Sequence, residues 1–131
     1  MPTRHPAAEP ITDRLIRFAL VGCGRIAATH FDALKQHHGR AQLVAVCDTK
    51  PAALQAAVDR TGAPGFDSLD ALLAAADTHQ ADIVTLATPS GLHPLQAVRV
   101  AASGRHVLSE KPMATKWDDG VAMVRACRDA G

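Results

Sequence analysis

The stretch LVGCGRIAATH, Leu20–His30, marks the point where a strand is expected to turn into a helix. The run Ile16–Val21, which leads into it, is apolar and partly β-branched, which is typical of a buried strand. Gly22, Gly24 and Ala27 then fit the pattern G-x-G-x-x-G/A, whose glycines permit a tight turn and let a pyrophosphate approach the backbone. The small third residue lets the helix pack on the strand. By itself the motif fits either a dinucleotide site or a tight turn between two core elements.

Outward from this turn, apolar β-branched runs alternate with segments of helical period, which predicts a parallel sheet covered by helices. The expected strands are Ile16–Val21, Gln42–Asp48, a short one within 63–66, Ala81–Thr88 and His106–Glu110. The expected helices lie within 25–38, 50–62, 69–76, 94–102 and 117–130. The predicted fold is therefore α/β, a Rossmann-type doubly wound parallel sheet.

The chain stops after the last expected helix, where a Rossmann-type sheet would add its sixth strand. We therefore expect a fold truncated before that strand and before a C-terminal substrate domain. Residues 1–14 are expected to form a loose N-terminal tail, and residues 15–131 a dinucleotide-binding domain that is incomplete at its C-terminus. Such a domain should expose a strand edge and apolar surface, which favours aggregation or pairing with a partner.

Residues at the expected helix ends carry signals of their own. Ser68 is expected to cap the helix that follows it, and Thr115 with Asp118 resembles a capping box for the last helix. Gly39 is the expected stop of the first helix. Trp117 is expected to pack the last helix against the sheet, or against a domain that is absent.

The composition is that of an ordinary globular protein: 47% of the residues are apolar, 21% are charged, and the net charge is +1. No basic stripe suggests nucleic acid, and no cationic amphipathic helix suggests a membrane surface. No apolar run approaches the roughly 20 residues of a membrane span, and the leader lacks the apolar centre of a signal peptide. We expect neither nucleic acid nor a membrane as a partner.

Cysteines and histidines show no pattern of a disulfide framework or a metal site. The cysteines, Cys23, Cys47 and Cys127, are odd in number and far apart, which indicates a reducing, cytoplasmic compartment. Cys23 is interpreted as a small core-facing filler rather than a nucleophile. The seven histidines form no HExxH motif and no zinc-type spacing, so no metal is expected.

Asp48 ends the second expected strand, 26 positions after Gly22. That is near the roughly 20 positions at which a dinucleotide-binding unit places the acid that binds the adenosine ribose hydroxyls. A carboxylate there would repel a 2′-phosphate, which favours NAD over NADP, although Lys50 lies close by. The alternative is that Asp48 caps the next helix, and the two roles can coexist.

Two further segments lie at carboxyl ends of strands, where open α/β sheets bind ligands. The first is ATPSGLHP, Ala87–Pro94, which otherwise is an ordinary loop with Ser90 as a cap and His93 as a helix-start residue. The second is SEKP, Ser109–Pro112. A desolvated lysine in that place can help to remove the proton of an alcohol whose hydride goes to nicotinamide. The alternative for Lys111 is a surface Glu–Lys pair before a turn proline.

Four blocks, FALVGCGRIAATH, VCD, ATPSGLHP and SEKPMAT, resemble the glucose–fructose oxidoreductase / inositol dehydrogenase (Gfo/Idh/MocA) family in order and spacing. They cover Ile16–Gly131, the nucleotide-binding half of that family. The amino-acid sequences of these blocks are most similar to the subgroup of bacterial UDP-N-acetylglucosaminuronate 3-dehydrogenases, which act in lipopolysaccharide biosynthesis.

The resemblance implies NAD as cofactor, Lys111 as the catalytic-site lysine, and a Lys111–Pro112 bond that is often cis. Arg25 and Ile26 would lie over the pyrophosphate and Asp48 on the adenosine ribose. The cofactor-binding residues that it implies are Gly22, Gly24, Arg25, Ile26, Ala27, Asp48, Thr88, Pro89, Ser90, His93, Glu110 and Lys111. Full-length relatives are expected to be homo-oligomers.

The resemblance further implies an oxidoreductase that transfers hydride between NAD and a sugar or nucleotide-sugar carbinol, C3 of a UDP-N-acetylglucosaminuronate-like substrate. Typical members continue through a large sheet that binds the sugar and carries an aspartate and a histidine for acid–base chemistry. No residue of this chain takes those roles, so the chain alone is expected to be inactive. The alternatives are a non-catalytic NAD-binding module or pseudoenzyme remnant, and a different Rossmann reductase with a non-sugar substrate.

Overall fold

A computed structural model describes residues 9–131 and contains one sheet of five parallel strands. The strands are β1 (Ile16–Val21), β2 (Ala41–Cys47), β3 (Gly65–Phe66), β4 (Ile83–Leu86) and β5 (His106–Ser109). Their spatial order is β3-β2-β1-β4-β5, the order of a Rossmann-type sheet. The α/β doubly wound fold is thus confirmed.

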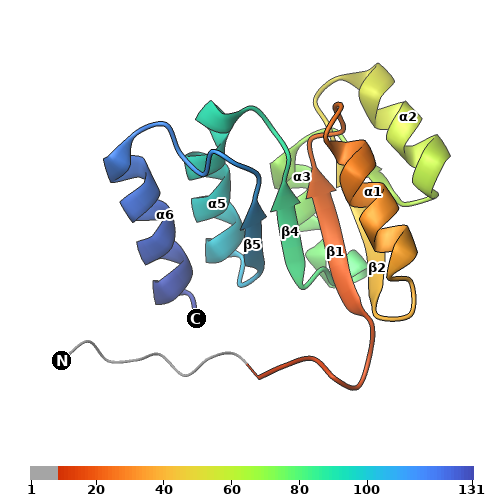
Figure 1. Cartoon of the computed structure of the whole chain (residues 1–131), viewed down its shortest axis with the longest axis horizontal. Coiled ribbons are helices and arrows are strands. Elements are labelled where there is room, and N and C mark those ends of the chain that lie inside the picture. The colour runs from red at the N-terminus through yellow and green to blue at the C-terminus, as the bar shows by residue number, and fades with distance from the viewer. Residues whose placement is uncertain (1–8) are drawn as a thin grey trace.

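Helices cover both faces of this sheet (Figure 1). They are α1 (Ala27–Gln36), α2 (Pro51–Thr61), α3 (Leu69–Ala74), α4 (Ala76–His79), α5 (His93–Ala102) and α6 (Trp117–Asp129), with a 3-10 turn, η1, at Ser90–Leu92. Side chains alternate between the faces along each strand: Leu20 packs in a core cluster with α1 and α2, whereas its neighbours Ala19 and Val21 pack with α3, α5 and α6. None of the described helices has the length and apolar character needed to cross a membrane.

One of the expected helix caps is confirmed and another is wrong. Ser68 Oγ accepts a hydrogen bond from Ala71 N at 3.0 Å and caps α3, as expected. The expected capping box at Thr115 and Asp118 is wrong, because the residue before α6 is Lys116, in an extended conformation with φ −127° and ψ 138°. Thr115 therefore lies one residue too early to reach the free amides of the helix, and no side chain caps α6.

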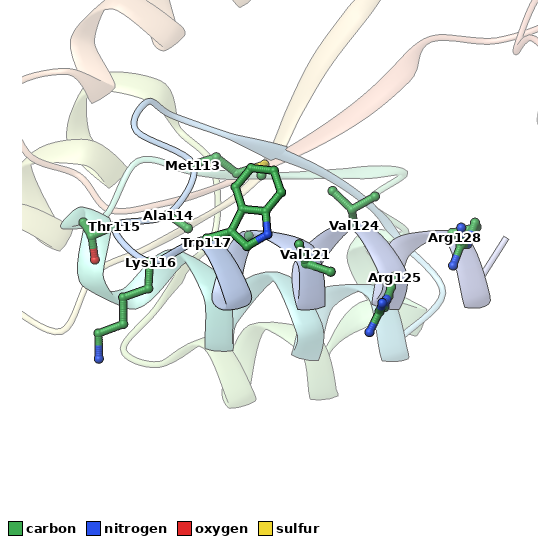
Figure 2. Close-up of a pocket in the computed structure, with 10 residues that line it drawn as sticks. Met113, Ala114, Thr115, Lys116, Trp117, Val121, Val124, Arg125 and Arg128 are labelled. Atoms are coloured by element: carbon green, nitrogen blue, oxygen red, sulfur yellow. The ribbon is translucent and has the colours of Figure 1, made fainter.

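One other expectation about the helices is wrong, and one of the two alternatives for Trp117 is excluded. The first helix ends at Gln36, three residues before Gly39, and Gly39 does not adopt a left-handed conformation. Trp117 does not pack α6 against the sheet: it is 84% exposed. Figure 2 shows its indole standing above the helix at a hollow of about 580 Å³ that Met113, Val121 and Val124 also line. The side of α6 that carries Trp117, Val121 and Val124, with Arg125 and Arg128 beside them, is thus uncovered by any described residue.

The N-terminal segment contacts the sheet at the end where its parallel strands begin. Of the expected loose tail, residues 1–8 lie outside the described part of the chain, and residues 9–14 contain neither helix nor strand. Arg14 nevertheless forms two hydrogen bonds of 2.8 Å with the carboxylate of Asp82, which also accepts from Arg17 N at 2.8 Å. The bond from Arg14 holds the pKa of Asp82 below its usual range.

Replacing the cap of α3 tests this account of the helix starts. Ser68→Ala should lower the free energy of unfolding by about 1 kcal/mol, because the Ala71 amide loses its acceptor. Thr115→Ala is the matched control and should leave stability unchanged within about 0.5 kcal/mol. Urea unfolding of both variants measures the difference. Equal losses in the two would show that Thr115 does cap α6.

Candidate functional site

The carboxyl ends of β1, β2 and β4 meet at a pocket of about 640 Å³. It is lined by Gly22 and Gly24 after β1, by Asp48 after β2, and by Thr88 and Pro89 after β4. The strand order places β1 between β2 and β4, so the connections after β1 and β4 leave the sheet in opposite directions. This is the switch point at which open α/β sheets bind ligands.

At Gly22 the backbone of the loop after β1 contacts the backbone of the loop after β4. Its φ of +95° lies in the left-handed region, and a Cβ built on it would be 2.6 Å from Ala87 O and 2.9 Å from Thr88 N. Gly22 N donates to Cys47 O at 2.8 Å, and Ala87 N donates to Val21 O at 2.8 Å. Only glycine therefore allows the loops after β1 and β4 to lie in backbone contact.

The rest of the glycine motif behaves differently from Gly22. A Cβ on Gly24 would meet no atom within 4 Å, so the space outside this backbone is open for a ligand. Ala27, the small third residue, is 1% exposed and packs in the core with Leu20 and Phe31. Arg25 and Ile26 lie exposed between them, at the start of α1. The free amides of that helix start face the same edge of the sheet and favour an anion.

Asp48 holds the glycine loop with one oxygen and its own turn with the other. Oδ2 accepts from Cys23 N at 2.8 Å, and Oδ1 accepts from Lys50 N at 2.8 Å. The alternative in which Asp48 caps α2 is wrong, because the residue before that helix is Lys50 and no side chain caps it. Each carboxylate oxygen has a further lone pair, so Asp48 can still accept from the hydroxyls of a ribose.

The thiol of Cys23 is not poised for chemistry. Burial raises its pKa to about 11, and burial likewise raises the pKa of Cys47 to about 12. Cys23 Sγ donates to Cys47 O at 3.3 Å and packs against the core beside α1. Both thiols stay protonated near neutral pH, which agrees with the interpretation of Cys23 as a filler.

Thr88 is held from α5. Its hydroxyl donates to Gln96 Oε1 at 2.5 Å, and its carbonyl accepts from His93 Nε2 at 2.7 Å. Ser90 opens the turn η1 and does not cap α5, since the residue before that helix is Leu92 and no side chain caps it. Gln96 also lines the pocket and was missed from the sequence, although its position one turn after His93 places it on the same side of α5.

The turn after β5 carries Glu110 and Lys111. Glu110 Oε1 lies 2.8 Å from His30 Nε2 of α1, and this contact holds the pKa of Glu110 below its usual range. The surface Glu–Lys alternative holds only in part: Glu110 Oε2 accepts from the backbone amide of Lys111 at 3.2 Å, no ion pair joins the two side chains, and the Lys111 charge adds to the lowering of the Glu110 pKa. The Lys111–Pro112 bond is cis. Lys111 is exposed, so the described residues do not supply the desolvation expected around it.

The expected site residues thus form two groups. Gly22, Gly24, Asp48, Thr88 and Pro89 line one pocket, whereas Glu110 and Lys111 lie one strand further along the same edge. The glycine turn, the open space at Gly24 and the acid at Asp48 fit a dinucleotide. Within residues 9–131 no group of three histidine, cysteine or acidic side chains could hold a metal ion.

Comparison with known proteins agrees with this geometry. The model of the GFO_IDH_MocA oxidoreductase family, NAD-binding Rossmann fold, matches residues 16–131. The inositol 2-dehydrogenase of Rhizobium meliloti is 39% identical over 114 residues, which are 86% of this chain and 31% of that protein. This chain therefore spans about a third of the length of that relative.

Two solved structures are more similar still. The WlbA dehydrogenase of Chromobacterium violaceum, in complex with NADH and UDP-GlcNAcA, is 61% identical with a TM-score of 0.88. The match covers 92% of this chain and 34% of that one. The WlbA dehydrogenase of Bordetella pertussis, in complex with the same two ligands, is also 61% identical, with a TM-score of 0.89 over 93% of this chain and 36% of its own.

The two glycines of the loop should respond differently to the same substitution. Gly22→Ala should lower the free energy of unfolding by about 2–3 kcal/mol, because the new methyl group meets the Ala87 backbone at a positive φ. Gly24→Ala should change it by less than about 0.5 kcal/mol, since its Cβ enters open space. Thermal or urea unfolding compares them. Equal stabilities would contradict the close approach of the two loops.

Proposed function

The chain belongs to the Gfo/Idh/MocA oxidoreductase family and forms its NAD-binding Rossmann domain, and on that premise we propose the reaction that the domain serves. The reaction is hydride transfer between NAD and a ring carbinol, C3, of a UDP-N-acetylglucosaminuronate-like nucleotide sugar. The observation that carries this proposal is the 61% identity to two dehydrogenases that bind NADH and UDP-GlcNAcA. We further propose that the domain belongs to a cytoplasmic, homo-oligomeric enzyme of lipopolysaccharide biosynthesis.

Different residues of the pocket would bind different parts of the cofactor. The open backbone at Gly24 and the first amides of α1 would receive the pyrophosphate, with Arg25 and Ile26 over it. Asp48 would accept from the adenosine ribose hydroxyls with the lone pairs that Cys23 N and Lys50 N leave free. Thr88, Pro89 and Ser90 would lie along the cofactor on the β4 side.

Lys111 would act at the other end of the cofactor. Oxidation of a carbinol separates a hydride, which the nicotinamide of NAD accepts, from the hydroxyl proton, which a base must take. Lys111, held next to the fixed carboxylate of Glu110, would assist the loss of that proton from the sugar hydroxyl. The product is the ketone at the same carbon.

A non-catalytic NAD-binding module is the second candidate. It is favoured by the exposure of Lys111, around which the described residues form no closed site. In this case the pocket would bind NAD and the turn at Lys111 would have no substrate to act on. The two candidates agree on the cofactor and differ on turnover.

Nucleotide preference tests the role of Asp48. NAD should bind more tightly than NADP by about tenfold, because the carboxylate repels a 2′-phosphate. Asp48→Ala should weaken the binding of both nucleotides, since the Cys23 amide loses its acceptor. It should also reduce the difference between the affinities for NAD and for NADP. Asp59→Ala, at an exposed carboxylate of α2, is the control. Calorimetric titration of the three proteins with the two nucleotides gives six affinities, and equal affinities of the unmodified protein for NAD and NADP would remove Asp48 from this role.

Turnover tests the inactivity that is expected of the isolated chain. The purified 131-residue chain should bind NAD yet produce no NADH from UDP-GlcNAcA, because nothing described holds a sugar at the roughly 3–3.5 Å that hydride transfer needs. The absorbance of NADH measures the reaction, with Lys111→Ala as a background. Turnover that depends on Lys111 would refute inactivity of the isolated chain.

A further inference from the structure

His93 connects the two groups of site residues through opposite ends of one buried ring. We propose that it is a positioning residue, which sets the place of the Lys111 turn relative to the adenosine side of the pocket. This inference rests on the proposed function only in that Lys111 is taken to lie beside the nicotinamide half of NAD. The resemblance counts His93 among the cofactor-binding residues, but its side chain is 1% exposed, so in this account it touches no ligand itself.

The contacts of the ring reach two different strand ends. Nε2 lies 2.7 Å from the carbonyl of Thr88, which follows β4 and lines the nucleotide pocket. Nδ1 lies 3.0 Å from the carbonyl of Pro112 and 3.2 Å from Ser109 Oγ, so it faces the chain on both sides of Lys111. The imidazole is rigid, and its two nitrogens therefore fix the separation of the segments that they contact.

Hydrogen-bond chemistry keeps both ends engaged. A carbonyl oxygen only accepts, so Nε2 must carry a proton to bond Thr88 O. With that proton in place, a neutral ring accepts at Nδ1 from the Ser109 hydroxyl, for which Glu110 O at 3.0 Å is the competing acceptor, whereas a ring that carries both protons donates to Pro112 O. In either state the Nδ1 end holds the segment that carries Lys111, and no nitrogen of this buried ring is left without a partner.

The two segments do not depend on His93 equally. Thr88 is also held by Gln96 and by the contact of its backbone with Gly22. Among the described residues, the Lys111 turn has one other side-chain hydrogen bond to a distant element, the contact of Glu110 with His30. Loss of the Nδ1 contact should therefore leave the adenosine side in place and release the Lys111 turn.

Two substitutions separate the two ends of the ring. In His93→Asn the side-chain amide nitrogen can take the place of Nδ1 and keep the bond to Pro112, whereas in His93→Gln it can take the place of Nε2 and keep the bond to Thr88. The measurement is the affinity of the full chain for NAD and for ADP-ribose, which lacks the nicotinamide. Amide hydrogen exchange of residues 110–114 gives a second readout that needs no ligand.

His93→Gln should reduce the preference for NAD over ADP-ribose by roughly threefold to tenfold, the worth of one hydrogen bond, and should speed exchange at 110–114. His93→Asn should retain both properties within about twofold, and both variants should bind ADP-ribose as the unmodified chain does. A role in folding alone would affect the two variants alike, and would weaken ADP-ribose too.

Equal NAD preference and equal exchange in the two variants would overturn the proposal. If the unmodified chain bound neither nucleotide, the proposed function would fail, and hydrogen exchange alone would decide on His93. Faster exchange at 110–114 in His93→Gln than in His93→Asn would then support the positioning role, and the reverse order would contradict it.

Discussion

The structure depends on the backbone contact between Gly22 and the Ala87–Thr88 peptide. β1 and β4 are adjacent and parallel, and their carboxyl ends come so close that a Cβ at Gly22 would lie 2.6 Å from Ala87 O. This contact brings a glycine loop and a polar loop to one edge of the sheet. It also leaves the backbone at Gly24 facing open space, where a phosphate can approach.

Around this contact the same side chains build the site and hold its parts together. Asp48 presents a carboxylate to the pocket and at the same time anchors the glycine loop through Cys23 N. Glu110 joins the Lys111 turn to α1 through His30, and His93 joins that turn to the loop after β4. The pocket at the ends of β1, β2 and β4 is thus lined by described residues, whereas Lys111 and the side of α6 that carries Trp117 are exposed.

Local patterns predicted the features that depend on neighbouring residues. The strand at Ile16–Val21, the turn at Gly22 and the cap at Ser68 follow from residue types a few positions apart, and all three are confirmed. The capping box at Thr115 failed because it depends on the backbone conformation of Lys116, which residue types do not determine. The bond from Cys23 N to Asp48, and those from His93 to Thr88 and Pro112, join segments that only the completed sheet brings together. No spacing rule could have shown them.

The central claim is that this chain binds NAD at the carboxyl ends of β1, β2 and β4. Titration of ¹⁵N-labelled protein with NAD, followed by the amide resonances, tests it directly. The account predicts that the largest shifts fall at residues 22–27, 48–50 and 87–90. Shifts confined to the hollow at Met113–Arg128, or no shifts at saturating NAD, would contradict it.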